Sequence, residues 1–490
     1  MYLRPDNPAP KITTNPENTN YHCTASARTK SQAGKSYNGR ARPGKAVDTK
    51  TKILLITLEP IAKKMAGPAI RALELAKVLA QDFPVAVFSP VEGGEAPEGE
   101  LPANLRLVRG GGSRILRELA DEAETIFIQS NVLKPYPFLS GLGKYLILDL
   151  YDPYLFSVLV QYKNDRSQAS TSYRMMHQVL ETHMRACDFA VCASERQRDY
   201  WIGRFCAQGR ITPELYEFDP SLRKLIDVVP YGLPEEAPVK NGSGLREIVG
   251  IGPDDPVLIW GGGIWDWFDP NSVIEAVLTC VTEIPDLRLV FMGTKSPNPK
   301  VEVMDMTRRA RDLASESGLL DKNIFFLDGW VPYEERVNFL LEATAAVSAH
   351  FDLPETRFSF RTRILDYFWC GLPILTTTGD GLAELIQQHG AGIVLPYQDT
   401  QAWATAIKKV VSDAAARKSM QQGSGEIAKM FYWKNNAEPI RRFLKAPYHL
   451  PAFTAITMPN LAERARAVWR RGGRKLIIKR SVELINDILK

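Results

Sequence analysis

The chain has 490 residues, of which 45% are hydrophobic and 24% are charged, and its formal net charge is +5. This composition is that of a globular protein, and the length exceeds what one hydrophobic core holds, so we expect two domains with additional segments. The six cysteines form no Cys-x-x-Cys pair, which gives no sign of a disulfide framework or a zinc site and favours a cytoplasmic protein. No uncharged apolar run reaches the about 20 residues that span a bilayer, and the N-terminus lacks the apolar core of a secretory signal.

Positive charge is concentrated at both ends of the chain. Residues 1–50 and residues 461–490 each carry nine Lys or Arg and three Asp or Glu, a net charge of +6 apiece, so the middle carries −7. Residues 1–50 are also rich in Asn, Thr, Ser and Pro and poor in apolar side chains. We therefore predict a disordered basic segment at the N-terminus.

The basic C-terminal end forms part of a predicted tail at 451–490. It reads as two helical pieces interrupted at Gly472 and Gly473, with Trp469 and Ile477 among the cations. Such a basic amphipathic segment can lie on an anionic membrane surface. It can equally be a helix packed on the body of the protein with a solvated basic face. Periodicity alone does not separate these two alternatives.

Between these ends, apolar runs of strand length alternate with helical patterns. Residues 52–57 read as a buried strand, and a helix begins at Gly67 after a loop. The alternation predicts an α/β fold with mostly parallel sheets. Further strands of the first half are expected at Val85–Phe88, Leu105–Val108, Thr125–Gln129, Tyr145–Leu150, Phe189–Cys192 and Ile226–Val229, with helices at 168–186 and after Ser194.

The alternation restarts after a turn-rich linker at 241–244. The first strand of this half ends in three consecutive glycines at 261–263. Strands are expected at Val257–Trp260, Leu287–Met292, Ile324–Leu327 and Ala345–Ala349, and helices at Ser272–Thr282, Glu334–Glu342, 401–429 and Trp433–Leu444. Ligands of parallel sheets bind beyond the carboxyl ends of the strands, so the residues that follow each strand are candidates for the site.

The most informative stretch is 358–384, FSFRTRILDYFWCGLPILTTTGDGLAE. It predicts a helix with Arg361, Arg363 and Asp366 near its start and a left-handed cap at Gly371, followed by a buried strand and a second helix that begins after a glycine turn. Cations, a carboxylate and an exposed helix N-terminus suit the phosphates and ribose of a nucleoside diphosphate.

The two arginines are expected to differ in role. Arg361 and Arg363 are two residues apart, so they do not share a helix face. We expect Arg363 to bind phosphate and Arg361 to pair with an acid such as Asp366 or Glu355. Two tryptophans, Trp265 and Trp267, either stack on a ligand or fix their loop.

The stretch resembles the donor-binding core of retaining glycosyltransferases of the GT-B fold, the family 4-like enzymes of glycosyl transferases group 1. Asp366 lies five residues before Gly371, where the family has its ribose-binding Glu. Residues 380–384 lie where the family has Gly-Gly-x-x-Glu, and residues 390–394 match its next segment. The resemblance covers most of residues 52–445 and is most specific at 358–399.

The resemblance implies two Rossmann-like β/α/β domains that face each other across a cleft. It places an acceptor-side domain at 51–235, a nucleotide-sugar domain at 236–430, and at 431–450 a helix that crosses back to the first domain. The implied reaction moves a sugar from a UDP- or GDP-linked donor to a glycan or lipid-linked acceptor, with retention and without a metal or other cofactor. The implied partners are these substrates and, through 461–490, the inner face of an anionic membrane, but no nucleic acid.

Motif positions and strand ends together nominate the site residues. Catalytic roles are assigned to Arg361, Arg363 and Glu355. Gly67 and Asp152 are expected on the side of the acceptor and the diphosphate. The expected donor contacts are Gly261, Gly262, Gly263, Lys295, Asp366, Asp380, Gly381, Leu382 and Glu384.

The sequence departs from the family pattern at two positions. Gly262 stands where the family usually has Arg, and Phe358 stands where it has Glu, for which Glu355 is the candidate substitute. The departures indicate either a subgroup whose cations have moved to Arg361, Arg363 and Lys295 or a nucleotide-binding protein of this fold that has lost activity.

A nucleotide-dependent oxidoreductase is the remaining alternative. It rests on the three glycines at 261–263, which could open a dinucleotide site. Asp266 stands where the last glycine of G-x-G-x-x-G would be, and the first half of the chain has no such motif. A turn that lets the backbone approach the donor phosphates is the favoured interpretation.

Overall fold

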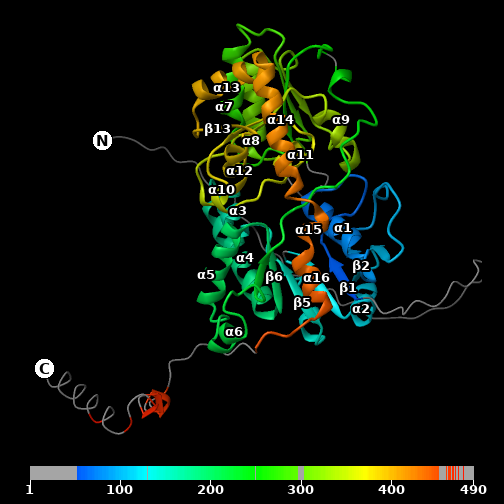
Figure 1. Ribbon diagram of the computed structural model, residues 1–490, viewed down its shortest axis with the longest axis vertical. Helices are drawn as coiled ribbons and strands as arrows, with labels where there is room; N and C mark the ends of the chain where they lie inside the picture. Colours follow the sequence, from blue (N-terminus) through cyan, green and yellow to red (C-terminus); the bar gives the residue numbers. More distant parts are fainter. Residues whose placement is uncertain are drawn as a thin grey trace, which may run out of the picture. The chain divides into compact units, whose positions relative to one another are not determined.

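The computed structural model describes residues 52–451, apart from Ser130, Val249 and residues 296–302, together with scattered residues between Asn460 and Ile478. The segment predicted at 1–50 and most of the tail at 451–490 lie outside the described residues. In the described ranges, none of the helices is both long and apolar enough to cross a membrane. Two parallel sheets with helices on both faces form the body of the protein (Figure 1).

The first sheet has seven parallel strands in the order β3-β2-β1-β4-β5-β6-β7. Its strands are β1 (Ile53–Ile56), β2 (Val85–Ser89), β3 (Leu105–Arg109), β4 (Thr125–Gln129), β5 (Tyr145–Asp149), β6 (Phe189–Cys192) and β7 (Ile226–Val228). β1 is apolar throughout because both of its faces are covered: Ile53 and Leu55 belong to one hydrophobic cluster, and Leu54 and Ile56 belong to another.

The helices of the first half follow the strands as the alternation predicts. They are α1 (Gly67–Leu79), α2 (Gly112–Glu122), α3 (Tyr154–Gln161), α4 (Arg166–Ala186), α5 (Glu195–Ala207) and α6 (Pro213–Phe218), with a 3-10 turn at Pro137–Gly141. α1 begins with Gly67 and Pro68, where a missing N–H costs nothing. Ser194 caps α5 by accepting a hydrogen bond of 3.2 Å from the Gln197 N–H, as its position predicts.

The second sheet has six parallel strands in the order β10-β9-β8-β11-β12-β13. The strands are β8 (Val257–Gly261), β9 (Arg288–Met292), β10 (Ile324–Leu327), β11 (Ala345–Ser348), β12 (Ile374–Thr377) and β13 (Gly392–Leu395). In both sheets the strand order reverses beside the first strand of the half, which is where Rossmann-like folds bind ligands. The predicted fold class, α/β with two Rossmann-like domains, is therefore confirmed.

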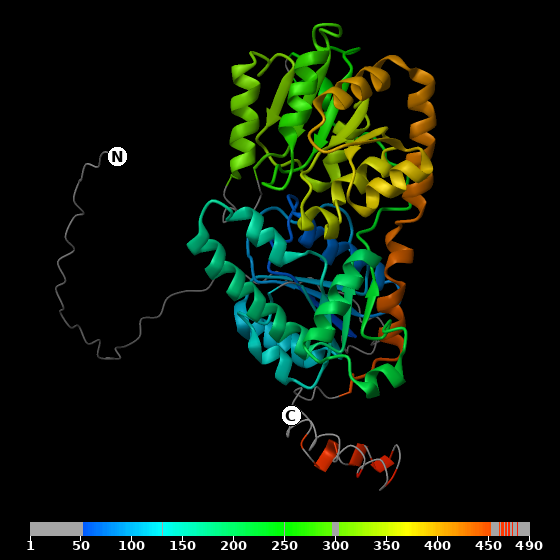
Figure 2. The same ribbon diagram turned by 90° about the vertical axis from the view of Figure 1, so that its left-hand side faces the viewer.

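The helices of the second half surround this sheet, as Figure 2 shows. They are α7 (Pro270–Cys280), α8 (Asp305–Glu316), α9 (Arg336–Leu340), α10 (Pro354–Phe358), α11 (Thr362–Trp369), α12 (Gly381–His389), α13 (Thr400–Ser412) and α14 (Ala414–Lys429), with 3-10 turns at Leu245–Glu247 and Tyr333–Glu335. Gly371 ends α11 with a φ of 62°, as its predicted role as a left-handed cap requires.

The chain returns to the first domain through α15 (Trp433–Asn436) and α16 (Glu438–Lys445). The returning segment lies beside α1 in Figure 1. The Arg441 Nε donates a hydrogen bond of 2.8 Å to an Asp82 oxygen, and the Trp433 ring lies 4.8 Å from that of Tyr231. A Cβ at Gly232 would lie 2.4 Å from the Trp433 ring, so this close approach requires glycine.

Candidate functional site

A cleft of about 420 Å³ lies between the two sheets at the carboxyl ends of their strands. The first domain lines it with the start of α1 and the loop between β5 and α3, and the second domain lines it with the loops after β8, β9 and β10 and the start of α11. The predicted residues that line it are Gly67, Asp152, Gly261, Gly262, Gly263, Glu355, Arg361, Arg363 and Asp366.

Arg361 forms a buried ion pair with Glu355. Its Nη1 and Nη2 donate hydrogen bonds of 3.0 and 2.7 Å to the two carboxylate oxygens, and both side chains are almost fully buried. The Ser359 hydroxyl donates a third hydrogen bond, of 2.6 Å, to the same carboxylate. Arg361 lies at the N-cap of α11 instead of inside the helix. Its charge is therefore already balanced by an acid of the neighbouring α10.

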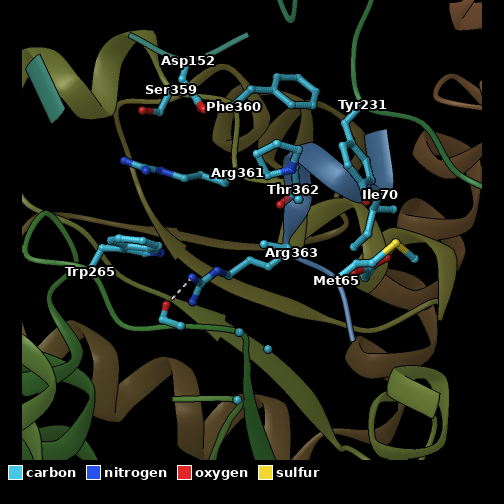
Figure 3. A pocket seen from close by; sticks show the side chains of 18 of the residues that line it. Met65, Ile70, Asp152, Tyr231, Trp265, Ser359, Phe360, Arg361, Thr362 and Arg363 are labelled. Carbon is cyan, nitrogen blue, oxygen red and sulfur yellow. Dashed lines mark hydrogen bonds between the residues drawn. The ribbon is translucent and has the colours of Figure 1, made fainter. Parts of the chain in front are cut away.

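Arg363 lies in the first turn of α11 and has no carboxylate partner among the described residues. Its Nη2 donates a hydrogen bond of 2.6 Å to the Gly263 carbonyl, drawn as a dashed line in Figure 3. The guanidinium lies 4.3 Å from the centre of the Phe268 ring, and its Nη1 is buried without a hydrogen-bond partner. Burial lowers the pKa of Arg363 to about 10. A cation held this way is ready for an anionic ligand.

Asp366, one turn further along α11, faces the cleft and forms an ion pair with Arg336 of α9 at 3.1 Å. Burial raises the pKa of the Asp366 carboxyl, and the Arg336 charge opposes this rise. Arg336 is itself stacked on the Tyr333 ring, 3.7 Å from its centre. The predicted contact of Asp366 with a ribose stays a prediction, and Arg336 is the cation that would orient this carboxylate.

The glycine loop after β8 places its backbone against Arg363. Gly262 has a φ of 113°, and a Cβ there would lie 3.8 Å from the Arg363 Nη2. Asp266, which interrupts the glycine pattern, accepts a hydrogen bond of 2.9 Å from the Met306 N–H and so ties the loop to α8. The rings of Trp265 and Trp267 stack in parallel with centroids 5.2 Å apart, and both line the cleft.

The first domain contributes an acidic group to the cleft. Asp152 follows β5, and burial raises the pKa of its carboxyl to about 7, helped by the nearby carboxylates of Asp149 and Glu355 and opposed by Arg361 and Arg71. Arg71 and Asp149 form a buried ion pair of 2.8 Å beneath it. A carboxyl that titrates near neutral pH in a cleft is typical of a functional position.

Phe358 lies outside the cleft lining, although the resemblance placed it where the family has a Glu. Its ring stacks on Phe156 of α3 with centroids 5.9 Å apart and lies 5.0 Å from Tyr200 of α5. Gln197 joins the domains at the same place, because its side-chain amide donates to the carbonyls of Tyr151 and Phe358. The departure at Phe358 therefore serves an aromatic contact between the two domains.

Five of the predicted donor contacts do not line the cleft, namely Lys295, Asp380, Gly381, Leu382 and Glu384. Asp380 caps α12 by accepting a hydrogen bond of 2.7 Å from the Ala383 N–H. Arg196 of α5 covers the same turn, donating a hydrogen bond of 2.8 Å to the Gly379 carbonyl and pairing with Glu384. Lys295 is exposed at the edge of the undescribed residues 296–302. Their contacts with a donor stay predictions.

Sequence reasoning missed several cleft residues. Arg336, Trp330 and Tyr333 lie on a loop and a short helix after β10, and Tyr231 follows β7. The Trp330 Nε1 donates a hydrogen bond of 2.9 Å to the Met65 carbonyl across the cleft. The position of Trp330 after a strand was the available signal, whereas no pattern links Arg336 to Asp366, 30 positions away.

The two facing Rossmann-like domains have the arrangement of the GT-B fold, and the comparisons with known proteins support a glycosyltransferase of this fold. Residues 255–413 match the family model described as Glycosyl transferases group 1. A D-inositol 3-phosphate glycosyltransferase of Stackebrandtia nassauensis is 25% identical over 72% of this chain and 74% of the relative. Another protein of that name, from Saccharomonospora viridis, is 26% identical over 40% of this chain, and this match spans only 44% of the relative.

Solved structures show the same fold. Sucrose-phosphate synthase from Thermosynechococcus elongatus superposes with a TM-score of 0.57 at 17% identity, covering 81% of this chain and 98% of that one. HepE from Anabaena, solved in complex with UDP-glucose, gives a TM-score of 0.58 at 16% identity, covering 81% of this chain and all of that one. The findings do not favour the two alternatives, an inactive protein of this fold and an oxidoreductase.

Proposed function

We propose that the protein transfers a sugar from a nucleoside-diphosphate donor, UDP- or GDP-linked, to a hydroxyl of a glycan or lipid-linked acceptor. The observation that carries the proposal is Arg363, a partly buried guanidinium that has no acid partner among the described residues and donates a hydrogen bond to the glycine loop at 261–263. A diphosphate seated there would receive charge-assisted hydrogen bonds from Arg363 and could approach the backbone at Gly262. The complex of HepE with UDP-glucose supports this kind of donor.

The same arrangement suggests how the bond breaks. As the bond between the anomeric carbon and the phosphate oxygen lengthens, negative charge develops on the diphosphate and positive charge on the sugar. Arg363 would stabilise the developing negative charge, and a preorganised donor of this kind is worth about 2.7–4 kcal/mol in the transition state. The leaving phosphate oxygen would take the proton of the acceptor hydroxyl on the same face of the sugar, so the anomeric configuration is retained without a metal.

A panel of nucleotides and nucleotide sugars tests the proposal directly. Calorimetry with UDP, GDP and ADP identifies the base, and the matching sugar nucleotides are then offered with acceptors in the presence of EDTA. We expect one nucleotide to bind and its sugar to be transferred, with the anomeric configuration of the product read by NMR. Absence of binding by all three nucleotides would refute the donor assignment. An inverted product would refute the proposed mechanism alone.

We further propose that the tail at 461–490 brings the enzyme to an anionic membrane, where a lipid-linked acceptor would be found. Trp469 and Ile478, two described residues of this tail, are 56% and 55% exposed. Exposed aromatic and aliphatic side chains among cations support contact with a membrane surface.

A further inference from the structure

Resting on the function proposed above, we infer that the acceptor is an uncharged polyhydroxylated sugar whose hydroxyls Asp152 binds, and that Asp152 rejects acceptors that carry a phosphate. The inference names the class of the acceptor and the residue that selects it. It separates this protein from the relatives whose name specifies a phosphorylated acceptor.

Charge is divided unequally between the two sides of the cleft. The arginines that line it, Arg336, Arg361 and Arg363, all belong to the second domain. The first domain contributes the acidic residues Glu59 and Asp152 together with tyrosines and aliphatic side chains. Among the described lining residues of that domain there is no Lys or Arg. The acceptor side therefore presents negative charge to an incoming molecule.

Two of the three arginines already have acid partners. Arg361 is bound by Glu355 through two hydrogen bonds, and Arg336 is paired with Asp366. Arg363 remains for the diphosphate of the donor. A second phosphate, on the acceptor, would thus lie near Asp152 without a cation of its own, and like charges at short range in a cleft repel strongly.

Asp152 has the properties of a group that binds sugar hydroxyls. No hydrogen bond or ion pair reaches its carboxyl from another side chain in the described ranges, and Figure 3 shows it at the wall of the pocket near Ser359. A carboxylate accepts charge-assisted hydrogen bonds from two hydroxyls, and the aromatic side chains of Tyr151 and Tyr154 line the same part of the cleft. Neutral sugars combine the hydroxyls and the C–H faces that such a wall fits.

The protonation state of Asp152 makes the selection depend on pH. The groups that face it are Asp149 on β5, Glu355 on α10, Arg361 before α11 and Arg71 on α1. Burial and the two carboxylates raise the pKa of Asp152 to about 7, and the two arginines oppose this rise. At a pH above this pKa, the ionised carboxylate repels a phosphate group. At a pH below it, the protonated carboxyl is neutral and this repulsion is lost. Discrimination against phosphorylated sugars should therefore be stronger at pH 8 than at pH 6.

The test uses the full chain saturated with the nucleotide that binds it, titrated by calorimetry with two pairs of sugars. The pairs are methyl α-glucoside with its 6-phosphate and myo-inositol with its 3-phosphate. At pH 8 we expect the neutral sugar of a pair to bind roughly tenfold or more tightly than the phosphorylated sugar of the same pair. Asp152→Asn should bind the neutral sugar more weakly and reduce that ratio towards one.

The control is Asp121→Asn, which makes the same change of charge at an exposed position of α2 and should behave as the parent. Tighter binding of the phosphorylated member, an unchanged ratio in Asp152→Asn, or no binding by either neutral sugar would overturn the inference. Nucleotide binding is measured in the same samples. Its loss would instead refute the proposed glycosyl transfer, so the two failures are distinguishable.

Discussion

Replacing Arg363 by Met removes one charge from the cleft and keeps most of the side-chain volume. Burial lowers the pKa of Arg363 from 12.5 to about 10, which corresponds to a cost of about 3 kcal/mol for the charged form in the folded protein. Removing the charge recovers this cost at neutral pH. It also removes the hydrogen bond to Gly263, about 1.5–3 kcal/mol, and the contact with Phe268, about 0.5–1 kcal/mol. The gain and the losses nearly cancel.

We therefore expect Arg363→Met to change the free energy of unfolding of the empty protein by less than about 1 kcal/mol. Binding of the nucleotide should respond differently, because a charge-assisted contact to the diphosphate is lost. Its loss is worth about 1.5–3 kcal/mol, which raises the dissociation constant about 10- to 150-fold. Urea denaturation without ligand and calorimetry with UDP and GDP measure the two quantities on the same variant.

Arg361→Met is the matched comparison, because it removes the other arginine of the same motif. Here the Glu355 carboxylate would remain buried without its cation, which typically costs about 3–5 kcal/mol of stability. One variant should therefore lose affinity and the other stability. Unchanged nucleotide affinity in folded Arg363→Met, or a stable Arg361→Met that has lost the nucleotide, would show that the two roles are wrongly assigned.

Three further outcomes are expected. Asp366→Ala should weaken binding of the nucleotide by about 1–3 kcal/mol but leave binding of pyrophosphate intact, since only the ribose loses a partner; equal losses for both ligands in calorimetry would contradict this role. Asp152→Asn should be more stable than the parent in urea at pH 8 but not at pH 4. The reason is that the folded pKa of about 7 lies above the usual 3.8, so the parent loses stability as pH rises through this window; a constant difference would contradict the shift. Deletion of 461–490 should abolish sedimentation with anionic vesicles at low salt and spare nucleotide binding, whereas equal sedimentation of both forms would assign the tail to packing.

The sequence predicted the order of the strands and helices well, because buried parallel strands such as β1 and the capping residues Ser194 and Gly371 leave local signals. It also placed Arg363 and Asp366 on one helix beside the cleft. The motif at 380–384 was less informative about position. Whether a helix start faces a cleft depends on the approach of the other domain, and here Arg196 covers that turn.

The features of the site that the sequence did not predict depend on contacts between residues that are far apart in the chain. The partner of Asp366 is an arginine on a short helix, and its own sequence neighbourhood carries no binding pattern. Phe358 was noted only as a departure from the Glu of the family pattern, whereas its contacts with Phe156 and Tyr200 are made across the domain boundary. Such contacts depend on how two separately folded sheets meet, and a local pattern of residues does not encode that geometry.

The return of the chain through α15 means that the two domains are joined by two covalent connections that lie side by side. The Leu233 N–H donates to the Phe431 carbonyl at 2.8 Å, and the Trp433 N–H donates to the Leu233 carbonyl at 3.0 Å. The Trp433 ring packs on Gly232, and together with these hydrogen bonds it holds the outgoing and returning segments of the chain side by side. Two adjacent covalent connections limit sliding and separation of the domains, so we expect the cleft to open for substrates by rotation about this crossing.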